Sequence, residues 1–298
     1  MAIPTHVAYT DESHHNVGHY RAIGMVSLTA NLAVELNDRI QELNLESDVR
    51  ECKWMKLRNA KYRFAIQKIV NLCLDYAKPN QLRIDVLIWD SHDSRHDIKG
   101  RDDNKNLQNM YVQLLKNVIY KRWNNGGLWL IFPDENSIID WVHVHNILSN
   151  YYSYNNDPQN LLDDNWEQNR PQHRIYKIVE ADSKSTCLCQ VIDIFTGMGV
   201  FSYEKRDIYN AWRDSHSPQL HLFPAEPYPF NPKDIEQSTV LDLFLDNLKT
   251  KGIETIFESN LGLYTSNPEQ IINYWFYKPQ RDTDKAPVHR KDLYSVND

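Results

Sequence analysis

The chain has 298 residues, 41% hydrophobic and 24% charged, which is typical of a globular protein with one large domain or two small ones. Its formal net charge of −7 excludes a globally basic surface, so any contact with nucleic acid must come from local patches. No apolar run approaches the roughly 18 residues of a membrane span, and the first residues lack the pattern of a signal peptide. The four cysteines have no disulfide-framework spacing, so we expect a cytoplasmic protein without membrane contact.

Hydrophobic periodicity predicts strands that alternate with helices along most of the chain. In chain order, the expected elements are strands at 6–13 and 20–29, a helix at 31–44, an extended piece at 48–54, a helix at 61–77, a strand at 82–90, a helix at 107–123, a strand at 128–136, a helix at 137–152 with Ser137 as its cap, a strand at 174–183, a helix at 186–201, a Pro-rich loop at 215–232, a helix at 234–252 and a strand at 272–279. This order predicts an α/β protein with a mixed sheet covered by helices.

Changes in composition and hydrophobic periodicity along the chain indicate its domain organisation. We expect a core domain over residues 1–205 and a C-terminal extension over residues 206–278 that packs on it and offers a surface for a protein partner. Residues 279–298 are polar and predict a flexible tail. No internal repeat is present.

Acidic residues follow the predicted strands. They are Asp11 and Glu12, Asp90, Asp134 and Glu135, and Glu180 and Asp182. Ligands of open α/β sheets gather outside the carboxyl ends of parallel strands, where several carboxylates repel one another unless protonated or bridged by cations. Acids are also common where a strand turns, because they bend and cap the backbone, so each alone has an ordinary structural reading.

Asp193 differs because it lies in the apolar part of a helix. Leu188, Val191, Ile192, Ile194 and Phe195 surround it and leave no sector of the helix for solvent. A buried carboxylate is costly unless it is paired or binds a metal, which favours a functional role. Gln190 lies three residues earlier and therefore shares its face.

Several of these motifs together resemble a bacterial family catalogued as domain of unknown function 3800. The stretches concerned are "YTDES", "ECKW", "FPDEN" and "EADSKSTCLCQVIDIFTG", in that order over about residues 5–205. The family shows a first-strand "DES", an E-x-K, an aspartate at a strand end and a "DSK…LLQLADLLTG" block. It is grouped with the ribonuclease H-like superfamily, so the resemblance implies a ribonuclease H-like fold and a two-metal nuclease site.

The resemblance also implies which residues form that site. Its acids and lysines fall on Asp11 and Glu12, Glu51 and Lys53, Asp134, Asp182 with Ser183 and Lys184, and Gln190 with Asp193. Two positions depart from the family, since His14 replaces the usual Gly after "DES" and Ile192 replaces the usual Ala before the helix aspartate. Both bulkier side chains would narrow the site.

The implied cofactor is Mg²⁺ or Mn²⁺, which prefers oxygen ligands. The expected metal ligands are Asp11, Asp90, Asp134, Asp182 and Asp193, with Asp90 placed only by its position at the end of a central strand. Such ions lower the pKa of a bound water and polarise the phosphate. Glu51 would complete the site, and Lys53 or Lys184 would neutralise charge that develops on the phosphate.

Cysteines and histidines give weaker signals. The spacing of Cys187 and Cys189 is wrong for a zinc site, so we expect the cysteines to pack in the core. His92 and His96 are four residues apart in a polar loop, which makes a zinc pair improbable. His14, His15 and His19 follow the first-strand acids, where either a solvated loop or an acid–base role fits.

A basic stretch between residues 53 and 63 has two readings. Lys53, Lys56, Arg58 and Lys61 lie near Trp54, and phosphate contacts combined with base stacking would suit nucleic acid. The start of a solvated helix fits the same residues equally well.

The sequence therefore predicts a metal-dependent nuclease that hydrolyses nucleic-acid phosphodiesters, by analogy in a setting such as bacterial phage defence. One alternative is a catalytically inactive module that keeps the fold and binds partners. Another is a metal-dependent enzyme acting on small phosphorylated molecules, which the negative charge favours.

Overall fold

A computed structural model describes residues 3–13, 18–93, 102–123, 126–135, 138–154, 173–182, 186–216, 229–258 and 261–278. The elements in chain order are β1 (His6–Ser13), β2 (Tyr20–Thr29), α1 (Ala30–Glu46), the 3-10 helix η1 (Trp54–Lys56), α2 (Ala60–Tyr76), β3 (Leu82–Asp90), α3 (Asp103–Asn117), the π-helix η3 (Val118–Arg122), β4 (Gly127–Pro133), α4 (Trp141–Tyr154), β5 (His173–Ile178), α5 (Cys187–Glu204), α6 (Arg206–Ser215), α7 (Pro232–Thr250), β6 (Thr255–Glu258), β7 (Gly262–Thr265) and β8 (Ile272–Phe276).

Six strands form the main sheet in the order β5-β4-β1-β2-β3-β8. β1, β2 and β3 are an antiparallel meander, whereas β4 and β5 continue parallel to β1 on its other side. The predicted α/β class with a mixed sheet is therefore confirmed. Its strand order and directions are consistent with a ribonuclease H-like fold.

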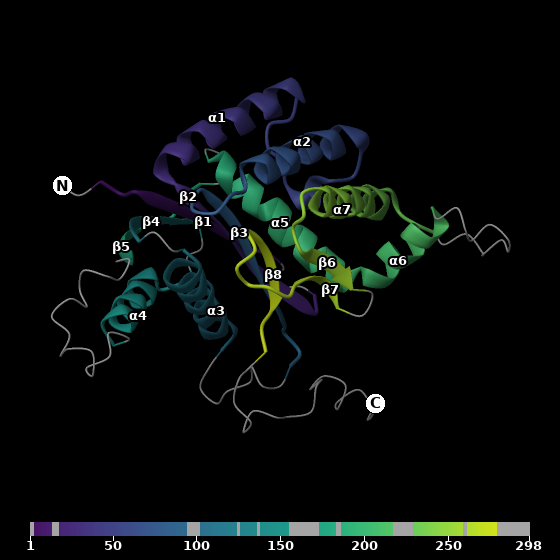
Figure 1. Cartoon of the computed structure of the whole chain (residues 1–298). Coiled ribbons are helices and arrows are strands. Elements are labelled where there is room, and N and C mark those ends of the chain that lie inside the picture. Colours follow the sequence, from purple (N-terminus) through teal and green to yellow (C-terminus); the bar gives the residue numbers. More distant parts are fainter. Residues whose placement is uncertain are drawn as a thin grey trace, which may run out of the picture.

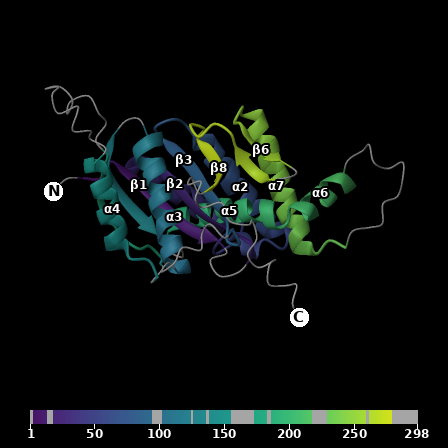
Figure 2. The same cartoon turned by 90° about the horizontal axis from the view of Figure 1, so that it is seen from below.

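Helices cover both faces of this sheet. Figure 1 shows α1, α2, α5 and α7 on one face and α3 and α4 on the other, and in the view from below α3 and α4 lie in front of the sheet (Figure 2). Within the described residues, no helix combines the length and the apolar character that crossing a bilayer requires.

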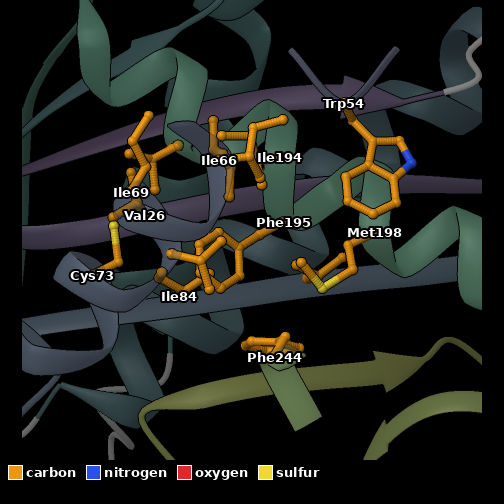
Figure 3. Close-up of a cluster of buried hydrophobic side chains, with 14 of the residues drawn as sticks. Val26, Trp54, Ile66, Ile69, Cys73, Ile84, Ile194, Phe195, Met198 and Phe244 are labelled. Carbon is orange, nitrogen blue, oxygen red and sulfur yellow. The ribbon is translucent and has the colours of Figure 1, made fainter. Parts of the chain in front are cut away.

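The sheet is buried on both sides, so its strands are apolar rather than alternating. Along β2, Ala22 and Val26 belong to the core under α5, and Ile23 and Met25 to the core under α3. Figure 3 shows how α5 brings Ile194, Phe195 and Met198 toward side chains of α2 and α7. α5 is thus a central helix, which explains why its sequence is apolar all round.

The structure departs from the predicted elements at several points. Residues 48–54 form no strand, and η1 begins at their end. The helix expected at 107–123 begins at Asp103 and finishes as a π-turn, and α4 begins at Trp141, where the Asp140 carboxylate accepts the backbone N–H of His143. Ser137 lies outside the described residues.

α6 and the hairpin β6–β7 were not predicted. The strands β6 and β7 have four residues each, which is too few for periodicity to identify them. α6 has ten residues with an amphipathic pattern that buries Tyr209 and Trp212, so its sequence signal was present and was missed. Part of the expected Pro-rich loop, residues 217–228, and the tail 279–298 lie outside the described residues.

The region 206–278 contributes directly to the core. β8 pairs in parallel with β3, from Ile84 opposite Ile272 to Ile88 opposite Phe276. Phe244 of α7 belongs to the same buried cluster as α2 and α5. This region completes the main sheet as well as packing on it.

One buried acid has a purely structural environment. Asp85 of β3 is fully buried, and its Oδ1 lies 2.6 Å from Nη1 of Arg122 and 3.4 Å from Nη2 of Arg83. The Arg122 guanidinium also lies over the Trp275 ring, 4.0 Å from its centroid. Because a buried charge needs a partner, this network anchors the π-turn to β3 and β8.

Candidate active site

α5 lies very close to β2, and two small residues make this possible. A Cβ added at Gly24 would lie 2.0 Å from Oγ1 of Thr196 and 2.5 Å from Ile192. On the other side of the helix, a Cβ at Gly197 would lie 2.5 Å from Cβ of Trp54. Because Gly24 is the strand partner of Asp11, this approach carries Asp193 over the end of β1.

Gln190 and Asp193 hold the segment between α1 and η1. The Gln190 Oε1 accepts the backbone N–H of Cys52 (3.0 Å) and the Nδ2 of Asn44 (3.1 Å). One turn later, Oδ2 of Asp193 accepts the backbone N–H of Trp54 at 2.7 Å. Spacing of three residues puts both side chains on one face, as predicted, and this face fixes Glu51 and Lys53 beside the acids of β1.

Asp11 and Glu12 point to different surroundings because successive strand residues face opposite sides of the sheet. Asp11 lies with Asp193 on the α5 side. Glu12 accepts a hydrogen bond from the Tyr111 hydroxyl of α3 at 2.5 Å. Glu12 therefore has a protein partner, although its charge still reaches Asp11.

Asp134 and Asp182 follow the two parallel strands beyond β1. The backbone N–H of Asp134 donates to the Thr10 carbonyl at 2.8 Å, and Asp134 forms a parallel bridge with Ala181. Asp134 is close enough to Asp11 and Asp193 for its charge to raise the pKa of both. Asp182, one residue after this bridge, is exposed at the rim.

The pKa values of the central acids are displaced upward. Burial, followed by the charge of Asp193, raises the pKa of Asp11 well above its usual value. Burial also raises the pKa of Asp193 to about 6, although the Trp54 N–H and the charge of Lys53 offset part of the effect. These carboxylates are half-buried and repel one another, as expected for groups that share a site. Asp11, Asp134, Asp193 and Glu51 are called the carboxylate cluster below.

Glu51 and Lys53 face the cluster as a pair. The Lys53 ammonium lies 3.2 Å from Oε1 of Glu51, and the Lys56 ammonium 2.5 Å from Oε2. Burial opposes ionisation of Glu51, but hydrogen bonds from Lys56 and Lys53 outweigh it and lower its pKa. Burial likewise opposes the charge of Lys53, yet its pKa is raised by Glu51 and then by Asp193 and Asp11. Lys53 therefore stays charged next to the acids.

Asp90 does not join the carboxylate cluster, contrary to the prediction from its strand-end position. Asp90 pairs with Tyr20, whereas Asp11 pairs with Gly24, four residues farther along β2. At about 3.3 Å per residue this is about 13 Å along the strands, with β2 in between. β3 extends farther along β2 than β1 does. Two residues that each stand at the end of a strand therefore lie at different levels of the sheet.

The cluster is also looser than a preformed two-metal site. The ligand atoms of His19, Asp90 and His92 all lie within 4.8 Å of one another, but those of Asp11, Asp134 and Asp193 do not meet this spacing within the described residues. An ion shared by these acids would therefore draw them together. Lys184 and Ser183 lie outside the described residues, as do His14, His15 and His96.

The remaining predicted residues have mixed surroundings. All four cysteines are buried and free, and burial raises the pKa of Cys189 to about 12, which suits packing. Of the basic stretch, Lys56 pairs with Glu51 and Lys61 with Asp48 at 2.6 Å. Arg58 is exposed. The pairing of His19 and His92 was missed because nothing in the sequence brings two loops 73 residues apart together.

Comparison with known proteins identifies relatives along nearly the whole chain. The chain is 39% identical over 289 residues to "Uncharacterized protein ORF2'" of Methanothermobacter thermautotrophicus, covering 94% of this chain and 96% of that protein. It is 38% identical over 288 residues to "Uncharacterized protein ORF2" of the same organism, with the same coverage. The chain belongs to the ORF2 family.

The ORF2 family thus has the length of the whole chain, including the C-terminal region that supplies β8. No protein-family model matches the chain. Both of these ORF2 relatives come from an archaeon.

Proposed function

We propose that this ORF2-family protein is a divalent-metal-dependent nuclease that hydrolyses phosphodiester bonds at the carboxylate cluster. The proposal rests on the placement of Asp11 and Asp193, which are half-buried and have pKa values raised first by burial and then by the charge of neighbouring carboxylates. Carboxylates with strongly perturbed pKa values cluster at functional sites. The resemblance to the family of domain of unknown function 3800, grouped as ribonuclease H-like, points to the same chemistry.

The donor set fits Mg²⁺ or Mn²⁺. Asp11, Asp134 and Asp193 offer hard oxygen ligands, and the acids of the cluster outnumber Lys53 and Lys56, which are both engaged by Glu51. A cation would remove the repulsion that raises the pKa of Asp11. Asp85 shows the contrast, because two arginines already neutralise it.

The protein residues have distinct tasks in this proposal. Asp11 and Asp193 hold the metal, with Asp134 as the third candidate ligand, and the bound ion would activate water and polarise the phosphate. Lys53 remains charged and is placed to stabilise negative charge that develops on the phosphate. Gln190 fixes the backbone that carries Glu51 and Lys53 and is a positioning residue.

A nucleic-acid substrate is supported by the segment that follows Lys53. The Trp54 N–H binds Asp193 directly, so the basic stretch starts at the cluster. The exposed Arg58 provides a cation near the site, whereas Lys56 and Lys61 would have to exchange Glu51 and Asp48 for a phosphate. Such local charges can compensate for the net charge of −7 when a phosphate backbone binds.

The test is cleavage of labelled single-stranded DNA, double-stranded DNA and RNA with Mg²⁺ or Mn²⁺. Asp11→Asn and Asp193→Asn keep the size of the side chain and one acceptor oxygen but remove the negative charge, and we expect each to reduce the rate by at least about 10³-fold, equivalent to several kcal/mol of transition-state stabilisation. Asp207→Asn, an exposed acid on α6, is the matched control and should retain full activity.

Two results would overturn the proposal. One is metal-dependent cleavage that both Asp variants retain, because it would arise elsewhere or from a contaminant. The other is the absence of cleavage on all three polymers while a small phosphodiester such as bis-(p-nitrophenyl) phosphate is hydrolysed, which would assign the site to small phosphorylated molecules.

A further inference from the structure

Two histidines and an aspartate meet at the far end of β2 and β3, away from the carboxylate cluster. His19 precedes β2, Asp90 ends β3 and His92 lies two residues later. Each offers one ligand atom, and the three atoms all lie within 4.8 Å of one another. We refer to these residues as the histidine group.

The contacts within the histidine group are close. The Nε2 of His19 lies 3.3 Å from Oδ1 of Asp90, and the two imidazole rings have centroids 4.0 Å apart. Two ligand atoms at 2.0–2.2 Å from a tetrahedral ion lie about 3.3–3.6 Å apart, so the His19–Asp90 pair already has this spacing and the remaining atoms have to move closer from within 4.8 Å. The His19 side chain is 32% exposed, which leaves its ring room to rotate.

The backbone holds the segments that carry these ligands. Ser91 donates to the His19 carbonyl from its backbone N–H and from its hydroxyl, both at 2.9 Å. The Glu204 carboxylate of α5 accepts the backbone N–H groups of His19 and Tyr20. The backbone N–H of His92 donates to Oδ1 of Asp90 at 2.8 Å. The site is therefore preorganised, as metal ligands are by their outer partners.

We propose that His19, Asp90 and His92 bind a divalent transition-metal ion that prefers imidazole nitrogen, with Zn²⁺ as the representative, at a site independent of the carboxylate cluster. Two imidazoles and one carboxylate suit Zn²⁺ and its neighbours, whereas Mg²⁺ favours oxygen alone. Three protein ligands leave at least one position for water or an exogenous ligand.

A cavity lies next to the neighbour of His19, although none of the three residues of the histidine group lines it. Tyr20 lies with its ring centroid 5.0 Å from that of His19 and also lines a cavity of about 650 Å³. Tyr203, Trp275 and Phe276 contribute aromatic walls to the same cavity.

The test uses the full chain stripped with EDTA and then dialysed against Zn²⁺, with bound metal measured by mass spectrometry. Titration with Co²⁺ gives a visible spectrum that reports nitrogen and oxygen ligands. We expect His19→Gln, His92→Gln and Asp90→Asn each to weaken this binding by at least about 100-fold, because even outer partners of a metal site contribute 10–100-fold. The control His143→Gln changes an exposed histidine on α4 and should bind as the parent does.

Two further measurements distinguish metal binding at the histidine group from metal binding at the carboxylate cluster. Asp11→Asn should keep the Co²⁺ spectrum, and millimolar Mg²⁺ should not displace Zn²⁺ from the parent. Circular dichroism in EDTA checks that each variant folds. If a histidine variant does not fold, the isosteric Asp90→Asn variant still tests the proposal. The proposal is overturned if the parent binds no Zn²⁺, if the three ligand variants bind it as tightly as the parent, or if Mg²⁺ competes with it.

Discussion

In the carboxylate cluster, Asp11 and Asp193 come from a strand and a helix 182 residues apart, and burial together with nearby carboxylate charge raises the pKa of both. In the histidine group, the ligands come from two paired strand ends, and their backbones are joined by hydrogen bonds of Ser91. The first arrangement stores electrostatic repulsion, and the second has its ligand atoms within 4.8 Å without such repulsion. Clustering of acids and readiness to bind a metal are therefore separate properties.

Substitution of Gly197 is expected to have the largest effect, because it should disturb the carboxylate cluster and leave the histidine group intact. In Gly197→Ala the new Cβ would meet Trp54 at 2.5 Å, so the segment whose N–H binds Asp193 has to shift. We expect the free energy of unfolding to fall by about 2–4 kcal/mol, as overpacking and a lost buried hydrogen bond imply, with loss of cleavage. Urea denaturation measures the first effect and the polymer assay the second.

Gly199→Ala on the same helix is the control, because its added Cβ meets looser surroundings than that of Gly197→Ala. Its nearest neighbours would lie at 3.1–3.3 Å and are side-chain carbons, so the loss of stability should be clearly smaller. Zn²⁺ binding at the histidine group should survive both substitutions. Equal losses of stability would contradict the importance of the contact between α5 and Trp54.

The next effect is a pH dependence of stability in the metal-free protein. The pKa of Asp193 is about 6 when folded and 3.8 by its ordinary value, so the folded state binds this proton more tightly. The resulting stabilisation is present below about pH 4 and is lost as pH rises through 6, on the order of 1–3 kcal/mol. Asp193→Asn lacks this change, so its advantage over the parent should grow between pH 4 and 6.

Urea denaturation in EDTA across this pH range makes the measurement, with Asp207→Asn as the control. Mg²⁺ added above pH 6 should restore stability to the parent and leave Asp193→Asn unchanged. A parent and an Asp193→Asn variant with parallel pH profiles would show that Asp193 is not the repelled acid that its surroundings indicate.

The smallest effect concerns Glu12, which the resemblance placed with the catalytic acids. Tyr111→Phe removes the hydroxyl that donates to Glu12 and should cost about 1 kcal/mol of stability. If Glu12 is held as a structural acid on the α3 side, cleavage should change by less than about 3-fold. A loss as large as that of Asp11→Asn would instead place Glu12 in the reaction.

The sequence allowed much of the fold to be predicted because long elements carry strong periodicity. β1, β2 and β3 match the predicted bounds, and the apolar surroundings of Asp193 correctly indicated a central helix. Short elements such as β6, β7 and η1 carry too few residues for a period, so tertiary contacts decide them.

The site was predictable only where local spacing determines geometry. Gln190 and Asp193 share a helix face at any tertiary arrangement, and both hold the segment 52–54 as that face requires. Asp90 was misplaced because the relative extension of β1 and β3 depends on pairing register, which the chain does not display locally. The meeting of His19 with His92 depends on the same register.

The pairing of β8 with β3 has a consequence for the order in which the molecule is made. β3 is buried at all nine positions, yet its outer edge is covered by residues 272–276, which are synthesised 188 positions after their partners. Until that segment leaves the ribosome, an apolar strand edge stays open to pairing with other chains. A chain that stops before Ile272 should therefore aggregate during synthesis, even though both groups of candidate metal ligands would already be present.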